Sequence, residues 1–202
     1  MLKRAFDIVG ATVALVALAP LLLAVAVLIK LDSPGPVFFR QVRVGRHDRP
    51  FRIFKFRTMV VDQPHGAPQI TLAGDTRITR TGAWLRRTRV DELPQFIDVL
   101  RGTMSLVGPR PEVPRYVAHY PPALRERALA VRPGLTDPAS LDFIDEATLL
   151  ARAADPEREY IEVILPAKLQ RAADYAERAS LASDLAVLWR TLRVLLRSAV
   201  TR

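Results

Sequence analysis

The sequence predicts an α+β protein, mainly α-helical, in which an N-terminal membrane helix and a small β-hairpin precede a helical body with surface amphipathic helices. Three observations predict this class: a long apolar run at the N-terminus, two short segments of alternating apolar and polar residues, and helical periodicity over most of the rest. The 202 residues suffice for one domain with its own core. We therefore expect a membrane helix over residues 1–32 and one body over residues 33–202.

The composition indicates an anionic partner. The formal net charge is +9, which fits nucleic acid, anionic lipid or a phosphorylated substrate. The chain has no cysteine, so disulfides and thiolate sites are excluded. Its three histidines are scattered without metal-ligand spacing, which argues against a zinc site.

The N-terminal apolar run covers residues 8–29 and is long enough to cross a bilayer. It is too long for a signal peptide, and no small-residue cleavage site follows it. Pro20 removes a backbone hydrogen bond and predicts a break in the helix. Because Lys3, Arg4 and Lys30 flank both ends, and positive residues favour the cytoplasmic side, we expect a kinked re-entrant helix rather than a simple spanning one.

A β-hairpin is predicted next, with strands at residues 37–44 and 51–59 and a polar connection between them. Period-two alternation in the second strand places Lys55 and Arg57 on one face, so two cations emerge together at its end. The structural alternative is a solvated strand face.

Residues 61–80 are rich in Gly, Pro, Asp and Thr and are predicted to be a mobile loop. A short helix over residues 81–90 carries three basic residues, Arg86, Arg87 and Arg89. Asp91 is then expected to cap a second helix, which Gly102 ends. The apolar face of this helix is predicted to pack inward through Leu93, Phe96, Ile97 and Leu100.

Pro109 and Pro111 are expected to hold Arg110 in a fixed, extended conformation. Residues 116–129 are predicted to be helical, and residues 132–134 to form a turn. Asp155 and Pro156 indicate the start of further helices that continue to about residue 179. The last segment, residues 181–202, is a basic amphipathic helix that can either lie on a membrane surface or pack on the core. Its predicted apolar stripe is Leu181, Leu185, Leu188, Leu192, Leu195 and Leu196.

The adjacent carboxylates Asp91 and Glu92 are unusual in so basic a chain. Their structural explanation is a helix cap with a neighbouring ion pair. Their chemical explanation is phosphoryl transfer, because one carboxylate can attack phosphorus while the other holds Mg²⁺ together with substrate phosphates. Cations on three predicted elements could bind such a substrate: Lys55, Arg57, Arg86, Arg87 and Arg110. The spacing alone leaves open which carboxylate attacks.

On these residues the chain resembles the bacterial sugar transferases, the monotopic polyprenyl-phosphate phosphoglycosyl transferases that initiate exopolysaccharide, capsule or glycoconjugate assembly. The resemblance covers residues 2–136 in order and rests on the following residues: Lys3, Arg4, Asp7, Pro20, Gly35 to Phe38, Gln41, Arg43, Gly45, Phe51, Lys55 to Met59, Gly82, Arg86, Asp91 to Gln95, Gly102, Met104 to Pro111 and Arg132 to Thr136.

The resemblance implies a two-step transfer. Asp91 would be the nucleophile that attacks a UDP-sugar and releases UMP, and Glu92 would be the Mg²⁺ ligand. A polyprenyl (undecaprenyl) phosphate would then accept the sugar phosphate. Lys55, Arg57, Arg86 and Arg110 become candidates for phosphate contacts. The resemblance also implies inner-membrane lipid as a partner, the cytoplasmic face of the bacterial inner membrane as the location, and no nucleic-acid ligand; a homodimer stays open.

Two departures from the family pattern stand out. Ala19 occupies a position where many members have serine before the proline, so Pro20 must carry more of the helix break. After Thr136, many members continue Gly-Trp-Ala-Gln, whereas this chain has Asp137, Pro138, Ala139 and Ser140. If that segment lines the sugar or nucleotide pocket, the donor differs from the best-known acetamido sugars.

Two rival functions fit part of the sequence. A basic, membrane-tethered binding protein explains the charge and the apolar helix but not a central carboxylate pair. A nucleotide-sugar pyrophosphatase, in which water replaces the lipid, explains the pair. Nucleic-acid binding is disfavoured because the basic residues form no recognition-helix cluster and no stacking aromatics are suitably spaced.

Overall fold

The computed structural model describes residues 1–61, 71, 74–142 and 146–200. The strands are β1 (Phe38–Val44), β2 (Pro50–Phe56), β3 (Ser105–Val107) and β4 (Gly134–Thr136). The longer helices are α1 (Leu2–Asp32), α2 (Arg80–Thr88), α5 (Pro122–Ala128), α9 (Leu165–Arg178) and α10 (Leu181–Val200). Short helices are α3 (Phe96–Arg101), α4 (Pro114–Val117), α6 (Pro138–Asp142), α7 (Glu146–Ala151) and α8 (Pro156–Glu159), with 3-10 turns η1 (Arg46–Asp48) and η2 (Val90–Gln95) and a π-helical turn η3 (Tyr160–Ile164).

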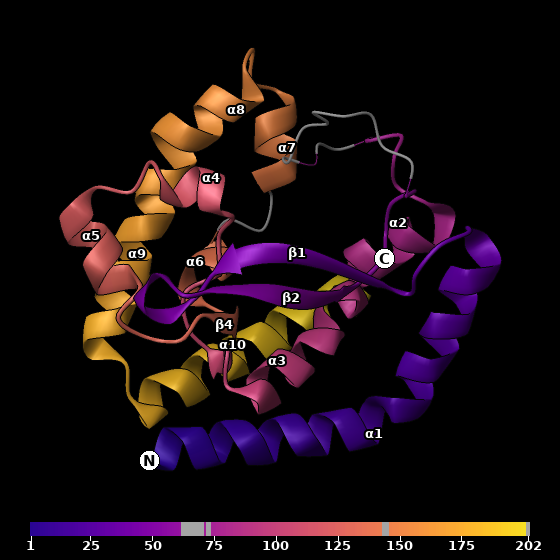
Figure 1. The fold of residues 1–202 in the computed structure, drawn as a ribbon, viewed down its shortest axis with the longest axis horizontal. Coiled ribbons are helices and arrows are strands. Elements are labelled where there is room, and N and C mark those ends of the chain that lie inside the picture. The colour runs from indigo at the N-terminus through magenta and orange to yellow at the C-terminus, as the bar shows by residue number, and fades with distance from the viewer. Residues whose placement is uncertain (62–70, 72–73, 143–145, 201–202) are drawn as a thin grey trace.

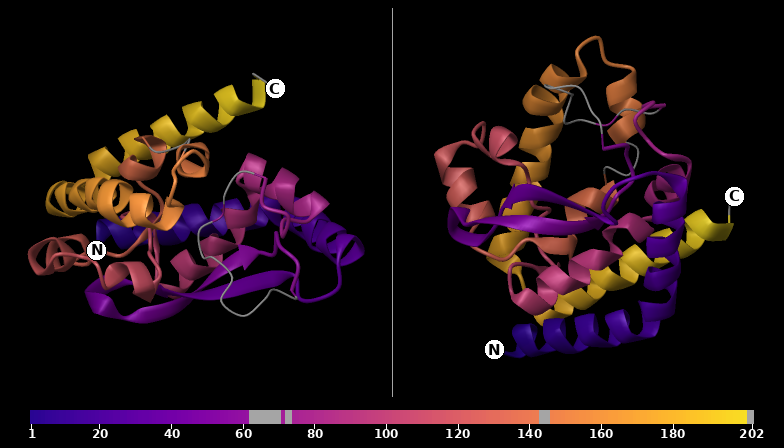
Figure 2. Two further views of the ribbon diagram at one scale, coloured as in Figure 1. Left: turned by 90° about the horizontal axis from the view of Figure 1, so that it is seen from above. Right: turned by 45° about the vertical axis from the view of Figure 1, so that its right-hand side comes forward.

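The predicted class is confirmed in outline, since helices dominate and a two-stranded antiparallel hairpin is present. The hairpin pairs β1 with β2, and Lys55 lies opposite Phe39. In Figure 2 (left) the hairpin and α10 lie on opposite sides of the molecule. A second sheet, in which β3 and β4 run parallel, was not predicted. It requires a close approach of two glycines, because a Cβ at Gly134 would lie 2.1 Å from the nitrogen of Gly108.

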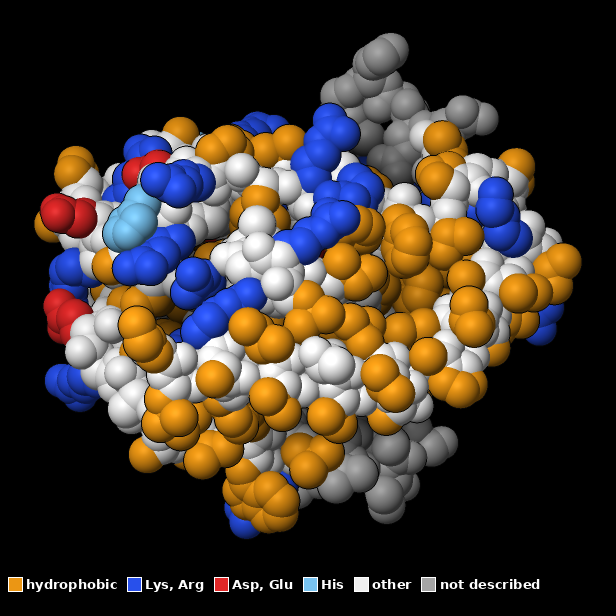
Figure 3. Space-filling view, turned by 60° about the horizontal axis from the view of Figure 1, so that its bottom comes forward, with side chains coloured by type: hydrophobic (Ala, Val, Ile, Leu, Met, Phe, Trp, Pro, Cys, Tyr) orange, Lys and Arg blue, Asp and Glu red, His pale blue; other side chains and the backbone are white. Residues whose placement is uncertain are grey.

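Helix α1 is long and apolar enough to cross a membrane, judged by length and composition alone. Figure 1 shows α1 running beneath the body and then turning upward, and Pro20 lies within it. Many of its apolar side chains are exposed, among them Val9, Val13, Val16 and Leu23. Figure 3 looks toward this side of the molecule and shows hydrophobic side chains spread across it.

Both ends of α1 are fixed to the same body. At the N-terminal end, Arg4 donates to the carbonyls of Val99 (2.7 Å) and Leu100 (3.0 Å), and so satisfies carbonyl groups near the end of α3. At the C-terminal end, the Thr81 backbone N–H donates to the Asp32 carboxylate at 2.9 Å. Lys30 Nζ donates to the carbonyl of Gly35 at 2.9 Å.

Buried charges strengthen the N-terminal attachment. Asp7 is 2% exposed, and its Oδ1 accepts from the Ser105 hydroxyl and the Leu106 backbone N–H, each at 3.0 Å. Lys3 and the Tyr175 hydroxyl both donate to the Asp184 carboxylate on α10. The same two groups also donate to the carbonyl of Val107, each at 3.1 Å. Helices α1, α9 and α10 therefore meet at strand β3.

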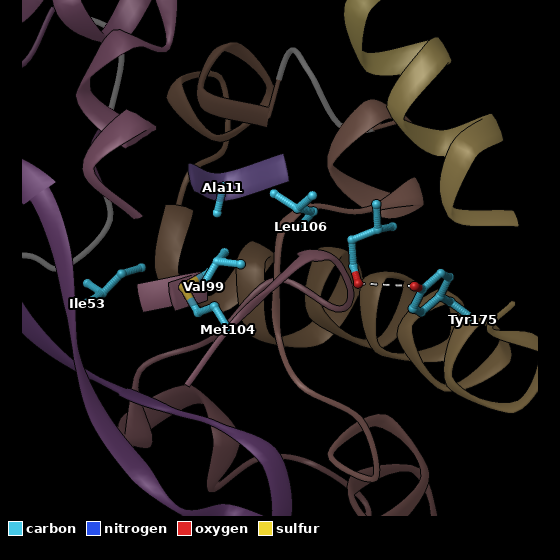
Figure 4. Packing of buried hydrophobic residues seen from close by; sticks show 7 residues of the cluster. Ala11, Ile53, Val99, Met104, Leu106 and Tyr175 are labelled. Atoms are coloured by element: carbon cyan, nitrogen blue, oxygen red, sulfur yellow. Dashed lines mark hydrogen bonds between the residues drawn. The ribbon is translucent and has the colours of Figure 1, made fainter. Parts of the chain in front are cut away.

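The main apolar core surrounds this junction. It brings together side chains from α1, β2, α3, β3 and α9 (Figure 4): Ala11, Ile53, Val99, Met104, Leu106, Val107 and Tyr175. The strand that leads into Gly108 and Pro109 is therefore buried on a rigid support.

We expect Asp7→Ala to lower the free energy of unfolding by about 3 kcal/mol, because it leaves two buried donors without an acceptor. Thermal or denaturant unfolding of the detergent-solubilised protein measures this loss. The control is Glu126→Ala, which changes an exposed carboxylate on α5. Equal stability of the two variants would contradict a structural role for Asp7.

Two expectations for the helices need correction, and one is confirmed. Residues 116–129 do not form one helix: α4 and α5 are separate, because consecutive prolines at 121 and 122 start a new helix. The helix ending at Gly102 buries Asp98 and Val99, whereas Leu100 from the predicted inward face is 37% exposed. Asp155 caps α8 as predicted, accepting from the backbone N–H groups of Glu157 and Arg158.

Only part of the predicted stripe of α10 packs on the core. Its inner face buries Asp184 and partly buries Val187 and Leu188. Leu185 and Leu192, both placed on the predicted stripe, are 50% and 46% exposed. The apolar residues of α10 are therefore divided between a face that packs on the core and one that is exposed.

Candidate active site

The two adjacent carboxylates lie in the first turn of η2. Arg89 ends α2 in the left-handed conformation (φ 60°) and leads directly into this 3-10 helix. The expectation that Asp91 caps the helix is therefore wrong, since Arg89 occupies the capping position and no side chain caps it. Asp91 and Glu92 are 6% and 8% exposed, and both lie near the positive end of the helix dipole.

Glu92 is held by two cations from distant parts of the chain. Lys55 Nζ donates to Glu92 Oε1 at 2.8 Å, and Arg110 Nη2 donates to the same oxygen at 2.7 Å. The second oxygen, Oε2, has only a 3.5 Å contact with Arg110. Although burial opposes ionisation, Arg110 and Lys55 hold the pKa of Glu92 well below its usual range. Glu92 thus joins β2, η2 and the segment around Arg110.

Asp91 has a different environment. Lys55 Nζ lies 3.7 Å from Asp91 Oδ2, whereas the buried Oδ1 has no hydrogen-bond partner among the described residues. Burial raises the pKa of the Asp91 carboxyl, with Lys55 acting against that rise. Glu92 is therefore ion-paired with two cations, whereas one carboxylate oxygen of Asp91 has no protein donor among the described residues.

The backbone on both sides of Arg110 is hydrogen-bonded to other parts of the chain. The carbonyl of Pro109 accepts from the Gly134 backbone N–H at 2.9 Å, and the carbonyl of Pro111 accepts from Arg43 at 3.0 Å. The backbone on both sides of Arg110 is thereby fixed. Glu92 raises the pKa of Arg110 still further, so the guanidinium remains charged.

Arg86 also lies near the pair. Its Nε donates to the Thr58 hydroxyl at 2.8 Å. Burial lowers the pKa of Arg86, and the charge of Asp91 is the largest influence opposing that shift. The other two cations lie elsewhere: Arg87 is exposed on α2, and Arg57 donates to the carbonyls of Ile29, Ser33 and Pro34 at the end of α1. The structure thus groups Lys55, Arg86 and Arg110 with the carboxylates and places Arg57 at a helix terminus.

Two supporting residues were not singled out from the sequence. Asp98 is 1% exposed, and its carboxylate accepts from the Phe54 backbone N–H at 2.7 Å, which fixes the strand beside Lys55. Thr58 holds Arg86. Asp98 lies off the predicted apolar face of its helix, so helical periodicity gave no signal that it would be buried.

The carboxylate pair fits a magnesium ion. Among the described residues no group of three or more His, Cys, Asp or Glu side chains could hold a metal by themselves. Mg²⁺ needs fewer protein ligands, because it commonly takes one or two carboxylates and completes its coordination with water and substrate phosphates. Glu92 Oε2 has only a long contact with Arg110, so this oxygen can be a ligand while water and substrate phosphates complete the coordination.

In comparisons with known proteins, the chain is similar to sugar transferases. The family model described as "Bacterial sugar transferase" matches residues 1–198. An Aeromonas hydrophila protein named UDP-N-acetylgalactosamine-undecaprenyl-phosphate N-acetylgalactosaminephosphotransferase is 40% identical over 198 residues, which cover 96% of this chain and 44% of the relative. A UDP-glucose:undecaprenyl-phosphate glucose-1-phosphate transferase from Xanthomonas campestris pv. campestris is 40% identical over 201 residues. These residues cover 98% of this chain and 38% of the relative.

A Caulobacter vibrioides relative with the same name as the Xanthomonas protein is 40% identical over 198 residues, covering 96% of this chain and 69% of the relative. The chain thus spans less than half the length of the first two relatives. All three names specify undecaprenyl phosphate, but they differ in the sugar.

Proposed function

Because the chain belongs to the bacterial sugar transferase family, we propose that it transfers a sugar 1-phosphate from a UDP-sugar to polyprenyl phosphate and releases UMP. The names of the relatives support this substrate pair, and we infer that the transfer initiates polysaccharide synthesis. The observation that carries the proposal is the contrast between Glu92, held by two cations, and Asp91, whose buried Oδ1 has no partner.

In the first step Asp91 Oδ1 attacks the phosphorus that bears the sugar. A bond forms between that oxygen and phosphorus, and the bond from phosphorus to the bridging oxygen breaks, so that UMP leaves with its electron pair. In the second step a phosphate oxygen of the lipid attacks the same phosphorus. The aspartyl bond breaks, Asp91 is restored, and polyprenyl diphosphate sugar is the product.

The cations around the pair stabilise the charge of the diphosphate. Lys55 and Arg110 lie beside the carboxylates, and Arg86 approaches from α2, so donors come from three directions. When bound by Glu92 with the substrate phosphates, Mg²⁺ would neutralise part of the charge on the oxygens of the transferring group. Arg57 would support this site indirectly, by fixing the end of α1 against the strand that carries Lys55.

The position of α1 supports a re-entrant membrane helix on the cytoplasmic face of the bacterial inner membrane. Both ends of α1 contact the same body. A straight helix that spans the membrane would place its two ends on opposite sides, so a body on one side could contact only one of them. The bend in Figure 1 allows both ends to return to that body. The acceptor phosphate lies at the membrane interface, where the carboxylate pair would meet it. Because the chain lacks cysteine, single cysteines at residues 2 and 202 can be labelled in cells; a periplasmic residue 2 would contradict this topology.

The activity is tested with the purified chain, Mg²⁺, undecaprenyl phosphate and a panel of UDP-sugars. We expect UMP release with at least one donor and a lipid diphosphate sugar detectable by mass spectrometry. Continued UMP release without lipid, with no lipid product, would indicate the pyrophosphatase. Absence of UMP with every donor would indicate a membrane-tethered binding protein.

The pH dependence follows from the different environments of the two carboxylates. The nucleophile must be ionised, and the pKa of Asp91 lies above its ordinary value of 3.8. UMP release is therefore expected to fall as pH decreases through that pKa. Glu92, with a pKa well below 4.5, still holds its cations there, so its contribution to stability is lost only at lower pH. We therefore expect activity to be lost before stability as the pH decreases. A pH–rate profile and thermal unfolding at the same pH values test this order, and unfolding at a higher pH than the loss of activity would contradict it.

A further inference from the structure

Asp184 is a buried carboxylate that takes no part in the proposed mechanism. It lies on the inner face of α10 and is fully buried. Lys3 from α1 and the Tyr175 hydroxyl from α9 both donate to this carboxylate. Both groups also donate to the carbonyl of Val107, each at 3.1 Å, and the bond from Tyr175 is drawn as a dashed line in Figure 4. Asp184 therefore holds two donors against one backbone carbonyl.

That carbonyl belongs to the residue from which the chain leads to Arg110. Val107 ends strand β3. The next peptide unit is also fixed, because the Gly108 backbone N–H donates to the carbonyl of Thr136 at 3.1 Å. Two residues later, Arg110 Nη2 donates to Glu92 Oε1 at 2.7 Å. A displacement of the Val107 carbonyl would therefore be passed along a short, fixed backbone to the guanidinium in the site.

Helix α10 also supports the neighbouring strand. Thr191 lies about two turns after Asp184, and its hydroxyl is hydrogen-bonded to the Thr136 hydroxyl at 2.8 Å. Because β3 and β4 run parallel, their last residues, Val107 and Thr136, lie side by side. Helix α10 therefore holds the ends of both strands through two polar contacts.

Stability alone is a weak explanation for a carboxylate at this position. Removal of a carboxylate from water costs free energy that its ion pairs only partly recover, and apolar side chains often stabilise a core equally well. The inner face of α10 otherwise packs the apolar residues Val187 and Leu188 against the core. The distinctive contribution of Asp184 is geometric, because an apolar side chain could not hold Lys3 and Tyr175 on the same carbonyl.

We propose that Asp184 is a positioning residue for the transfer reaction and acts through Arg110. By keeping two donors on the carbonyl of Val107, it fixes the backbone from which the guanidinium reaches Glu92 and the diphosphate of the donor. A misplacement of about 1 Å caused by a distant substitution can reduce a rate by about 100-fold. The proposal rests on the proposed transferase function. It also gives the N-terminal end of the membrane helix a part in the site, through Lys3.

The experiment is a double-mutant cycle between Asp184→Asn and Arg110→Gln, measured by single-turnover UMP release from the preferred UDP-sugar. Asparagine keeps the size of the side chain but replaces one acceptor oxygen by an amide donor, so either Lys3 or Tyr175 loses its acceptor. We expect Asp184→Asn to reduce the rate by about 10-fold alone, and by less than about twofold beside Arg110→Gln, because the arginine through which it acts is then absent.

Unfolding of the same four proteins separates positioning from loss of folding. A purely structural effect would lower the fraction of folded protein, and hence the rate, by the same factor with and without Arg110. The shifts in denaturation midpoint should be additive, since Asp184 and Arg110 bind different partners, whereas the effects on the rate should not be.

Tyr175→Phe is a second variant that does not depend on the folding of Asp184→Asn. It keeps the ring in the apolar core and removes the hydroxyl that binds both Asp184 and Val107. We expect its effect on the rate to depend on Arg110 in the same way. The matched control is Tyr116→Phe, which removes a buried tyrosine hydroxyl in a separate apolar cluster and should leave the rate unchanged.

Two results would overturn the proposal: equal rate factors in the presence and absence of Arg110, or an unaltered rate in either folded variant. A wild-type protein that releases no UMP from any donor would instead overturn the transferase function on which the proposal rests.

Discussion

The Asp91→Asn variant is expected to lose UMP release by roughly a thousandfold or more, because an amide oxygen cannot replace the carboxylate as a nucleophile. The change preserves size, and it removes only a distant ion pair with Lys55, 3.7 Å away. Folding should therefore be retained. The measurement is single-turnover release of UMP from the preferred UDP-sugar.

A second observation separates Asp91 as nucleophile from Asp91 as a mere ligand of the phosphate. Incubation with donor but without lipid should give the unaltered protein a mass increase of one sugar phosphate, located on the peptide that contains Asp91. The Asp155→Asn variant is the matched control, since asparagine can still cap α8 and the residue lies outside the site. An adduct on Glu92, or full activity in Asp91→Asn, would contradict the assignment.

Much of the local structure follows from sequence pattern, because it depends on neighbouring residues. The hairpin, the helix end at Gly102 and the cap at Asp155 are all present. The errors arise where tertiary contacts override periodicity. The inner face of α10 contains a buried charge, Asp184, because Lys3 and Tyr175 bind it. The spacing of leucines in α10 contains no information about Lys3, which lies 181 residues from Asp184 in the sequence.

The same distinction applies to the site. The motifs identify Asp91, Glu92, Lys55 and Arg110, but not the contacts that make the two carboxylates different. Those contacts join residues 37 and 18 positions apart. For Arg57 the sequence pattern was misleading. Strand β2 ends at Phe56, and the Arg57 side chain donates to carbonyls at the end of α1. Strand alternation alone placed it beside Lys55.

Glu92→Gln is expected to reduce UMP release by about a hundredfold and to lower stability by roughly 3 kcal/mol. Glutamine keeps an acceptor for Lys55 and Arg110 but removes the charge that holds them. Two partly buried cations would then face a neutral amide, and the guanidinium of Arg110 would no longer be fixed beside Asp91. UMP release and thermal unfolding are measured on the same preparation.

A magnesium titration and a double variant distinguish the two contributions of Glu92. If Glu92 holds the metal, Glu92→Gln should need a higher Mg²⁺ concentration for half-maximal rate, whereas Arg110→Gln should not. If it also holds Arg110, the combined variant should be less impaired than the product of the single effects, because both single changes break the same contact. A variant with unchanged rate, Mg²⁺ requirement and unfolding would contradict both roles. A change in stability without a change in the Mg²⁺ requirement would show that Glu92 only positions Lys55 and Arg110. The metal would then depend on Asp91 and the substrate phosphates.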